Sequence, residues 1–102
     1  MKNIDITISD FYCTHCGKKG ISIPRKNNQR REAGHLKNLY CPYCREVHNA
    51  VEIRPYGKYT LQDFYIEFTN HNFDEKGKRI VPCNQFLGNY KNNRKDNVDN
   101  EV

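Results

Sequence analysis

Two short segments of the chain share one design: "YCTHCGKKG" at residues 12–20 and "YCPYCREVH" at residues 40–48. Each holds two cysteines separated by two residues, and 24 residues lie between the two pairs. A Cys-x-x-Cys turn aims both sulfur atoms at one point, so two such turns offer the four thiolates that a structural Zn²⁺ ion prefers. The sequence therefore predicts one structural zinc ion bound by Cys13, Cys16, Cys41 and Cys44.

The composition favours a metal over disulfides. A length of 102 residues indicates one domain. With 36% hydrophobic and 28% charged residues, the chain has little apolar surface to bury, so we expect a covalent cross-link or a bound metal to stabilise the fold. The N-terminal residues lack the apolar stretch of a secretory signal, and no segment has the length needed to span a bilayer. We therefore expect a cytoplasmic protein with reduced thiols, to which an odd number of cysteines also points. Two redox motifs are the alternative, but no βαβ pattern supports them.

Three histidines and a fifth cysteine are weaker candidates for the metal site. His15 lies inside the first turn, where we expect its side chain to point to solvent. His35 and His48 flank the second turn, and either is chemically able to replace one cysteine, although four thiolates form the better set. Cys83 stands alone after a proline, which is typical of a small buried core residue rather than a ligand or reactive thiol.

Alternating apolar residues predict strands at residues 3–9, 20–24 and 49–55. A turn is expected at Asp10, and Pro24 is expected to end the second strand. Residues 25–35 are expected to form a solvated loop or a short exposed helix.

The segment "YTLQDFYIEFTNH" at residues 59–71 changes to a helical period. One helix stripe is formed by Leu61, Phe64, Tyr65 and Phe68. Thr60 with Asp63 three residues later resembles a capping box. This pattern predicts a helix at about residues 60–70, whose aromatic stripe either packs on the sheet as core or forms a docking face for a partner. A turn is expected at residues 74–78, "DEKGK".

The net charge of +5 is concentrated around the cysteine pairs. Residues 17–45 carry +7, whereas residues 1–16 and 46–102 each carry −1. The basic side chains of this stretch are Lys18, Lys19, Arg25, Lys26, Arg30, Arg31, Lys37 and Arg45. Such a cluster is typical of phosphate binding, but the alternative is that these charges only keep a long surface loop solvated.

The strings "FYCTHCGKKG" and "LYCPYCREVH" resemble the two knuckles of a zinc ribbon. The resemblance implies a small antiparallel sheet closed by one metal over about residues 11–55. More loosely, "RREAGHLKNLYCPYC…HNAVEIR" followed by "DFYIEF…NFDEKGKR" resembles small zinc-ribbon proteins of phages and prophages of Gram-positive bacteria, which suggests an accessory role without a settled activity. The predicted fold is thus a small α+β zinc-ribbon domain at residues 1–90 with one helix in its C-terminal half, followed by a disordered tail at residues 91–102.

Two non-catalytic functions fit these features. The first is binding of nucleic acid, with RNA or single-stranded DNA favoured, through the basic residues and through stacking on Tyr12, Tyr40 and Tyr43. The second is an interaction module that docks on an acidic surface of a host protein. Catalysis is not expected, because a four-cysteine zinc site has no open position and the histidines do not fit a His-Asn-His nuclease. No small-molecule substrate is predicted.

Overall fold

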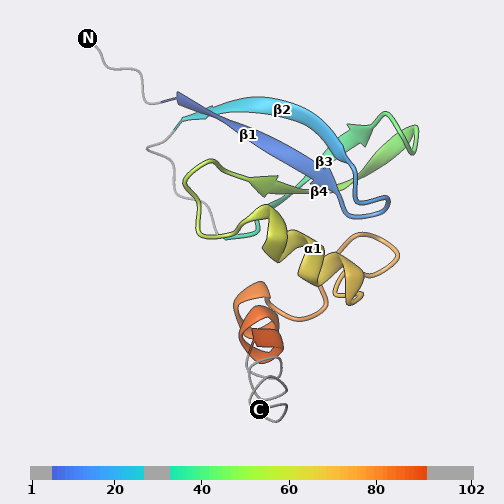
Figure 1. Cartoon of the computed structure of the whole chain (residues 1–102). Coiled ribbons are helices and arrows are strands. Elements are labelled where there is room, and N and C mark those ends of the chain that lie inside the picture. Colours follow the sequence, from blue (N-terminus) through green and yellow to red (C-terminus); the bar gives the residue numbers. More distant parts are fainter. Residues whose placement is uncertain (1–5, 27–32, 92–102) are drawn as a thin grey trace.

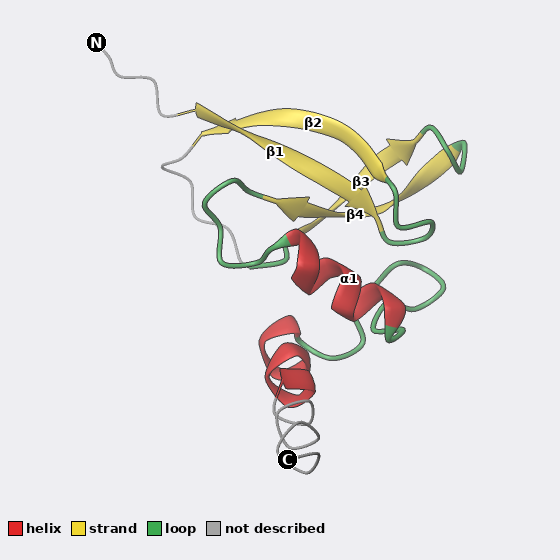
Figure 2. Cartoon of the chain, in the orientation of Figure 1, coloured by secondary structure: helices red, strands yellow, loops and turns green. Residues whose placement is uncertain are grey.

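The computed structural model describes residues 6–26 and 33–91, which form a small α+β fold (Figure 1). The elements in chain order are β1 (Ile6–Cys13), β2 (Lys19–Lys26), β3 (Leu36–Cys41), β4 (Glu46–Ile53) and α1 (Leu61–Thr69). The strands form one curled antiparallel sheet in the order β2-β1-β4-β3. A second helix, whose described part covers residues 83–91, follows α1 and lies on the side of α1 away from the sheet (Figure 2). The α+β class is confirmed, but the expectation of one helix is wrong.

The first two strands are longer than the sequence pattern predicts. The turn expected at Asp10 is absent, because β1 continues through a bulge beside Asp10 to Cys13. Pro24 does not end β2 but pairs with Ile8 inside the strand. Proline is tolerated there because β2 is an edge strand, where a residue without an N–H need not remove a hydrogen bond between strands.

The loop expected at residues 25–35 is only partly described. Residues 25 and 26 belong to β2, and residues 33 and 34 form a turn before β3. Residues 27–32 lie outside the described residues, as do 92–102 of the predicted tail. Lys91, the first residue of the predicted tail, is described and belongs to the second helix, so the prediction is wrong at that residue.

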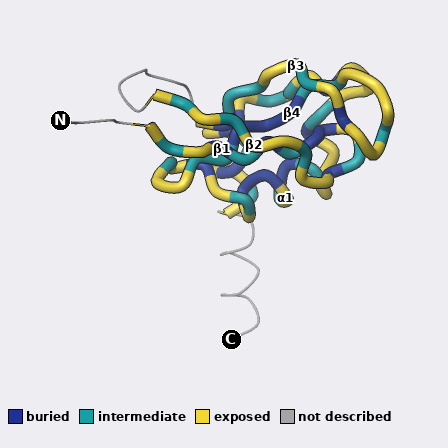
Figure 3. Tube along the Cα trace, turned by 90° about the horizontal axis from the view of Figure 1, so that it is seen from above, coloured by how far each residue is buried: buried dark blue, intermediate teal, exposed yellow. Residues whose placement is uncertain are grey.

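α1 packs its aromatic stripe against one face of the sheet. Tyr12 on β1 lies opposite Val51 on β4, and the ring centroid of Tyr12 is 5.7 Å from that of Phe64 on α1. Phe64 is fully buried in the core cluster, whereas Tyr65 is 41% exposed. Leu61, Phe64 and Phe68 of the stripe therefore belong to the core while Tyr65 stays outside it, and burial concentrates on β1, β4 and α1 (Figure 3).

The start of α1 is confirmed by its capping interactions. The backbone N–H of Asp63 donates to Thr60 Oγ1 at 3.2 Å, and the N–H of Thr60 donates to Asp63 Oδ2 at 3.0 Å. This reciprocal capping box satisfies two donors that a helix N-terminus would otherwise leave unpaired. The turn predicted at residues 74–78 is also present, with the N–H of Gly77 bonded to the carbonyl of Asp74 at 2.9 Å.

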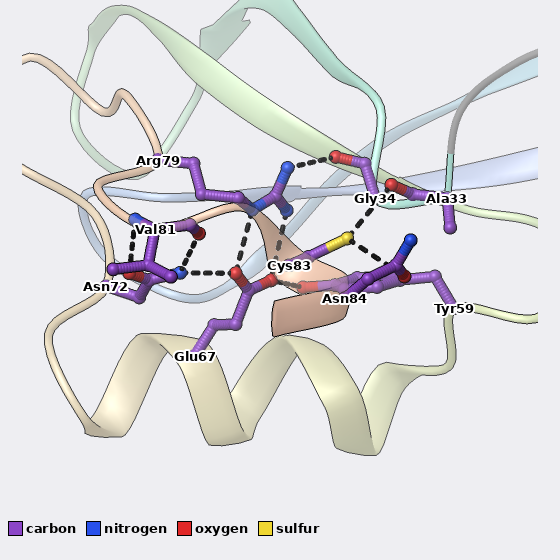
Figure 4. Close-up of polar contacts among 9 residues, drawn as sticks. All are labelled: Ala33, Gly34, Tyr59, Glu67, Asn72, Arg79, Val81, Cys83 and Asn84. Carbon is purple, nitrogen blue, oxygen red and sulfur yellow. Dashed lines mark hydrogen bonds and ion pairs between the residues drawn. The ribbon is translucent and has the colours of Figure 1, made fainter. Parts of the chain in front are cut away.

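A buried ion pair between Glu67 and Arg79, which the sequence does not predict, connects α1 to the segments around it (Figure 4). Glu67 on α1 is fully buried, and both its oxygens accept from Arg79: Nε at 2.7 Å and Nη2 at 3.0 Å. The hydroxyl of Tyr59 and the side-chain amide of Asn72 also donate to this carboxylate. Arg79 Nη1 donates in turn to the carbonyl of Gly34 at 2.8 Å. One network thus joins the turn before β3, α1 and the loop after α1.

The second helix completes the core below α1. Cys83 and Leu87, one turn apart, are buried in the same cluster as Phe64, and Phe86 packs against it. The prediction that Cys83 is a small core residue is confirmed, and its thiol lies 3.3 Å from the carbonyl of Ala33. No helix in the described part of the chain combines the length and apolar character that a bilayer crossing requires.

Candidate metal centre

The four cysteines of the two repeated segments meet at one end of the sheet. β1 and β3 both run antiparallel to β4, which lies between them, so the turns that follow them leave the sheet at the same end. The donor atoms of Cys13, Cys16, Cys41 and Cys44 all lie within 4.8 Å of one another. Across the two turns, Cys13 Sγ is 3.9 Å from Cys44 Sγ, and Cys16 Sγ is 3.7 Å from Cys41 Sγ.

These separations match a tetrahedral thiolate site. Zinc–sulfur bonds of about 2.3 Å in a tetrahedron place the sulfurs about 3.8 Å apart. Backbone N–H groups also point at the sulfurs, from His15 to Cys13 Sγ at 3.3 Å and from Cys44 to Cys41 Sγ at 3.4 Å. The four cysteines are therefore positioned to hold one metal ion, as the sequence predicts.

Both turns close in the same way. The N–H of Gly17 donates to the carbonyl of Cys13 at 2.8 Å, and the N–H of Arg45 donates to that of Cys41 at 2.7 Å. Gly17 and Arg45, the residues that follow each pair, have φ of +78° and +61°. This left-handed region suits glycine and disfavours arginine, so the second turn carries strain that the first avoids.

Substitution of Gly17 by alanine will destabilise the metal-loaded protein by about 2–4 kcal/mol. A Cβ at this position is strained by the positive φ and would lie 2.8 Å from Cε2 of the Phe68 ring on α1. The matched change Arg45→Gly relieves the same strain in the second turn and should alter stability by less than about 1 kcal/mol. Urea unfolding midpoints measure both effects, and equal losses in the two variants would contradict this account.

Bringing four thiols together shifts their protonation. Burial raises the pKa of Cys13, and burial together with hydrogen bonds that the Cys44 thiol makes to the sulfurs of Cys41 and Cys16 raises the pKa of Cys44. Burial alone would also raise the pKa of Cys41, but hydrogen bonds from the backbone of Cys44 and Tyr43 lower it to about 7. The metal-free cluster thus retains protons at neutral pH, and a bound cation must displace them.

His15 is exposed to solvent, as the sequence predicts, but it also lies beside the centre, with its Nδ1 3.4 Å from Cys44 Sγ. Its ring stacks on that of His48, with centroids 4.5 Å apart and planes 3° from parallel. His48 Nε2 lies 3.2 Å from a carboxylate oxygen of Glu46. His15, Cys44 and His48 therefore form a second donor group that shares one sulfur with the first.

Seven of the eight predicted basic residues fall into three groups. Lys18 and Arg45 are exposed beside the cysteine turns, and Lys19 is exposed within 3.6 Å of an Asp10 oxygen. Lys26 and Lys37 are exposed on the two edge strands, and Arg30 and Arg31 lie outside the described residues.

Arg25 differs from the other basic residues because its guanidinium has partners inside the fold. Its side chain is 13% exposed, its Nε lies 3.4 Å from an oxygen of Glu52, and its guanidinium carbon lies 5.8 Å from the ring centre of Phe11. We therefore leave Arg25 out of the surface proposed below.

The three tyrosines considered for stacking also differ. Tyr12 belongs to the core between the sheet and α1, whereas Tyr40 and Tyr43 are 56% and 59% exposed. The ammonium of Lys18, from the first turn, lies 4.8 Å from the ring centre of Tyr43, from the second. Comparison with protein-family models, curated proteins and solved structures finds no match to this chain.

Proposed function

We propose that the chain is a zinc-ribbon protein that holds one structural Zn²⁺ ion and binds nucleic acid without catalysing a reaction. The sulfur–sulfur separations of 3.7 and 3.9 Å support the ion. Four thiolates complete the tetrahedral coordination of zinc and leave no position for a reactive water, which supports a structural role. The ion then fixes the surface formed by the two turns.

The observation that carries the binding proposal is the pairing of Lys18 with Tyr43. The pair joins a cation and an exposed aromatic ring from two segments that the metal centre brings together. Cations contact phosphates, and aromatic rings stack on bases, so the combination suits RNA or single-stranded DNA better than the closed edges of a duplex. Arg45, which follows the second turn, and Lys19, which follows the first, are also exposed and add positive charge to the two turns.

A salt titration with a labelled single strand and a matched duplex tests this proposal. We expect the single strand to bind more tightly, and we expect the double variant Lys18→Ala/Arg45→Ala to weaken binding and reduce the slope of log K against log salt by about 1.4, since each phosphate contact on a single strand contributes about 0.7. Lys58→Ala is the matched control, because Lys58 is exposed in the loop between β4 and α1, at the opposite end of β4 from the cysteine turns. If the Lys18→Ala/Arg45→Ala variant loses no more affinity than Lys58→Ala, the proposed surface is wrong.

The contribution of Arg30 and Arg31 is measured by their joint substitution with alanine in the same titration. We expect weaker binding with an unchanged unfolding midpoint. An unchanged affinity would remove these two residues from the proposed surface.

Docking on an acidic host protein is the second candidate function. Tyr40 and Val47 lie directly opposite each other on β3 and β4, and both are more than half exposed. On α1, Phe64 is fully buried, whereas Tyr65 is 41% exposed and is therefore able to contact a partner. Recovery from lysate before and after nuclease treatment separates the two functions, because a protein partner survives the treatment. A phage-type accessory role would be compatible with either one.

A further inference from the structure

We propose that His15 is a reserve ligand of the metal centre, able to take the position of Cys44 and convert a four-cysteine site into a three-cysteine, one-histidine site. This inference rests on the zinc ion of the proposed function but concerns a residue outside its ligand set. Three thiolates and one imidazole are an established donor set for structural zinc.

The position of His15 supports this role. Its Nδ1 is 3.4 Å from Cys44 Sγ, so the nitrogen lies next to the coordination position that this sulfur would occupy. Because His15 is exposed and belongs to the turn between Cys13 and Cys16, rotation of its side chain moves the nitrogen without moving the sheet. Among the described residues, Cys44 is the cysteine of the cluster that shares a donor group with histidines.

His48 acts as a positioning residue for His15. The parallel stack, with ring centroids 4.5 Å apart, holds the His15 ring in the plane that directs Nδ1 toward Cys44. The side chain of His48 is mostly buried, and its Nε2 lies 3.2 Å from Glu46, so the supporting ring is itself held in place. Carboxylates that orient a histidine are a common feature around metal sites.

The exchange is chemically balanced. The bond from the ion to Cys44 Sγ breaks, and a bond from the ion to His15 Nδ1 forms. The neutral imidazole keeps its proton on Nε2, and the released thiolate takes a proton from solvent. The charge of the centre changes from −2 to −1, because one anionic donor is replaced by a neutral one.

Zn²⁺ competition with a chromophoric chelator on the full chain tests the proposal through two matched variants, Cys44→Ala and Cys16→Ala. Cys16 and Cys44 are each the second cysteine of their turn and are both half-buried, but only Cys44 lies next to His15. We expect Cys44→Ala to bind one ion about 100-fold more tightly than Cys16→Ala, since one of four donors accounts for at least that factor in a structural site. Adding His15→Ala should abolish the advantage of Cys44→Ala and leave Cys16→Ala unchanged.

Equal affinities of the two cysteine variants, or insensitivity of Cys44→Ala to loss of His15, would overturn the proposal. A second measurement uses the native chain: after limited alkylation, native mass spectrometry should show a species modified at Cys44 that retains its ion. Loss of the ion on that single modification would also overturn it. If the unaltered chain binds no zinc, the proposed function fails; if it binds zinc and only these comparisons fail, the reserve ligand alone is wrong.

Discussion

If the chain holds the proposed zinc ion, its removal by a chelator will unfold the protein, with a loss of about 10 kcal/mol or more of folding free energy. That figure is comparable to the whole stability of a typical domain, about 5–15 kcal/mol. Two of the four cysteines, Cys13 and Cys41, are buried, so the metal-free chain must either bury thiols beside one another or open the ends of β1 and β3. Far-ultraviolet circular dichroism and urea unfolding with and without chelator measure the loss, and added Zn²⁺ should reverse it.

Cysteine variants provide the matched control for this result. Cys13→Ala should lower the unfolding midpoint toward that of the chelated protein, because it removes a donor from the ion and weakens its binding. Cys83→Ala should keep one bound ion and lose only about 1 kcal/mol, because Cys83 is also buried but packs in the hydrophobic core with the second helix. An unfolding midpoint that does not respond to chelation would show that the hydrophobic core suffices without a metal.

The exchange between the metal-loaded and metal-free states also determines how resistance to chelation depends on pH. The loaded centre holds four thiolates, whereas burial keeps the pKa values of Cys13 and Cys44 above the ordinary thiol value in the metal-free cluster. The metal-free state therefore binds more protons, and lowering the pH favours it. The chelator concentration needed for unfolding should fall as the pH is lowered.

The parts of the fold that the sequence predicts are those specified by residues close together in the chain. The spacing of the two Cys-x-x-Cys pairs predicts the convergence of four sulfurs, which the structure confirms. Thr60, Asp63 and the stripe around Phe64 predict α1 to within a residue or two, because capping and helical period are local signals. The second helix was missed although Cys83, Phe86, Leu87 and Tyr90 recur at the same helical spacing.

The parts that the sequence does not predict depend on pairs distant in the chain. Glu67 is a charged residue that a periodicity argument places on the solvent side of a helix, yet it is fully buried because Arg79, twelve residues later, folds back onto it. Nothing in the spacing of these two residues signals the contact. His15 is a similar case, because its neighbours Cys44 and His48 come from the other half of the sheet.

Glu67→Gln will destabilise the metal-loaded protein by about 3–5 kcal/mol, the cost of leaving a buried charge without its partner. The variant keeps the size of the side chain, removes the negative charge that Arg79 binds through two nitrogens, and turns one accepting oxygen into an NH2 donor. Burial alone would lower the pKa of Arg79, but Glu67 raises it above its ordinary value, so the guanidinium stays charged. Glu75→Gln, an exposed change in the 74–78 turn, should alter stability by no more than about 0.5 kcal/mol.

A rescue variant separates the lost charge pair from general damage to the core. Glu67→Leu/Arg79→Met removes both charges, and apolar side chains of similar volume often replace a buried pair at little cost. We therefore expect the double variant to be more stable than Glu67→Gln, although the carbonyl of Gly34 and the donors of Tyr59 and Asn72 lose partners. Urea unfolding of the four proteins, each with metal bound, provides the comparison. A double variant less stable than Glu67→Gln would mean that the hydrogen bonds of this network, rather than charge compensation within it, hold α1 to the rest of the fold.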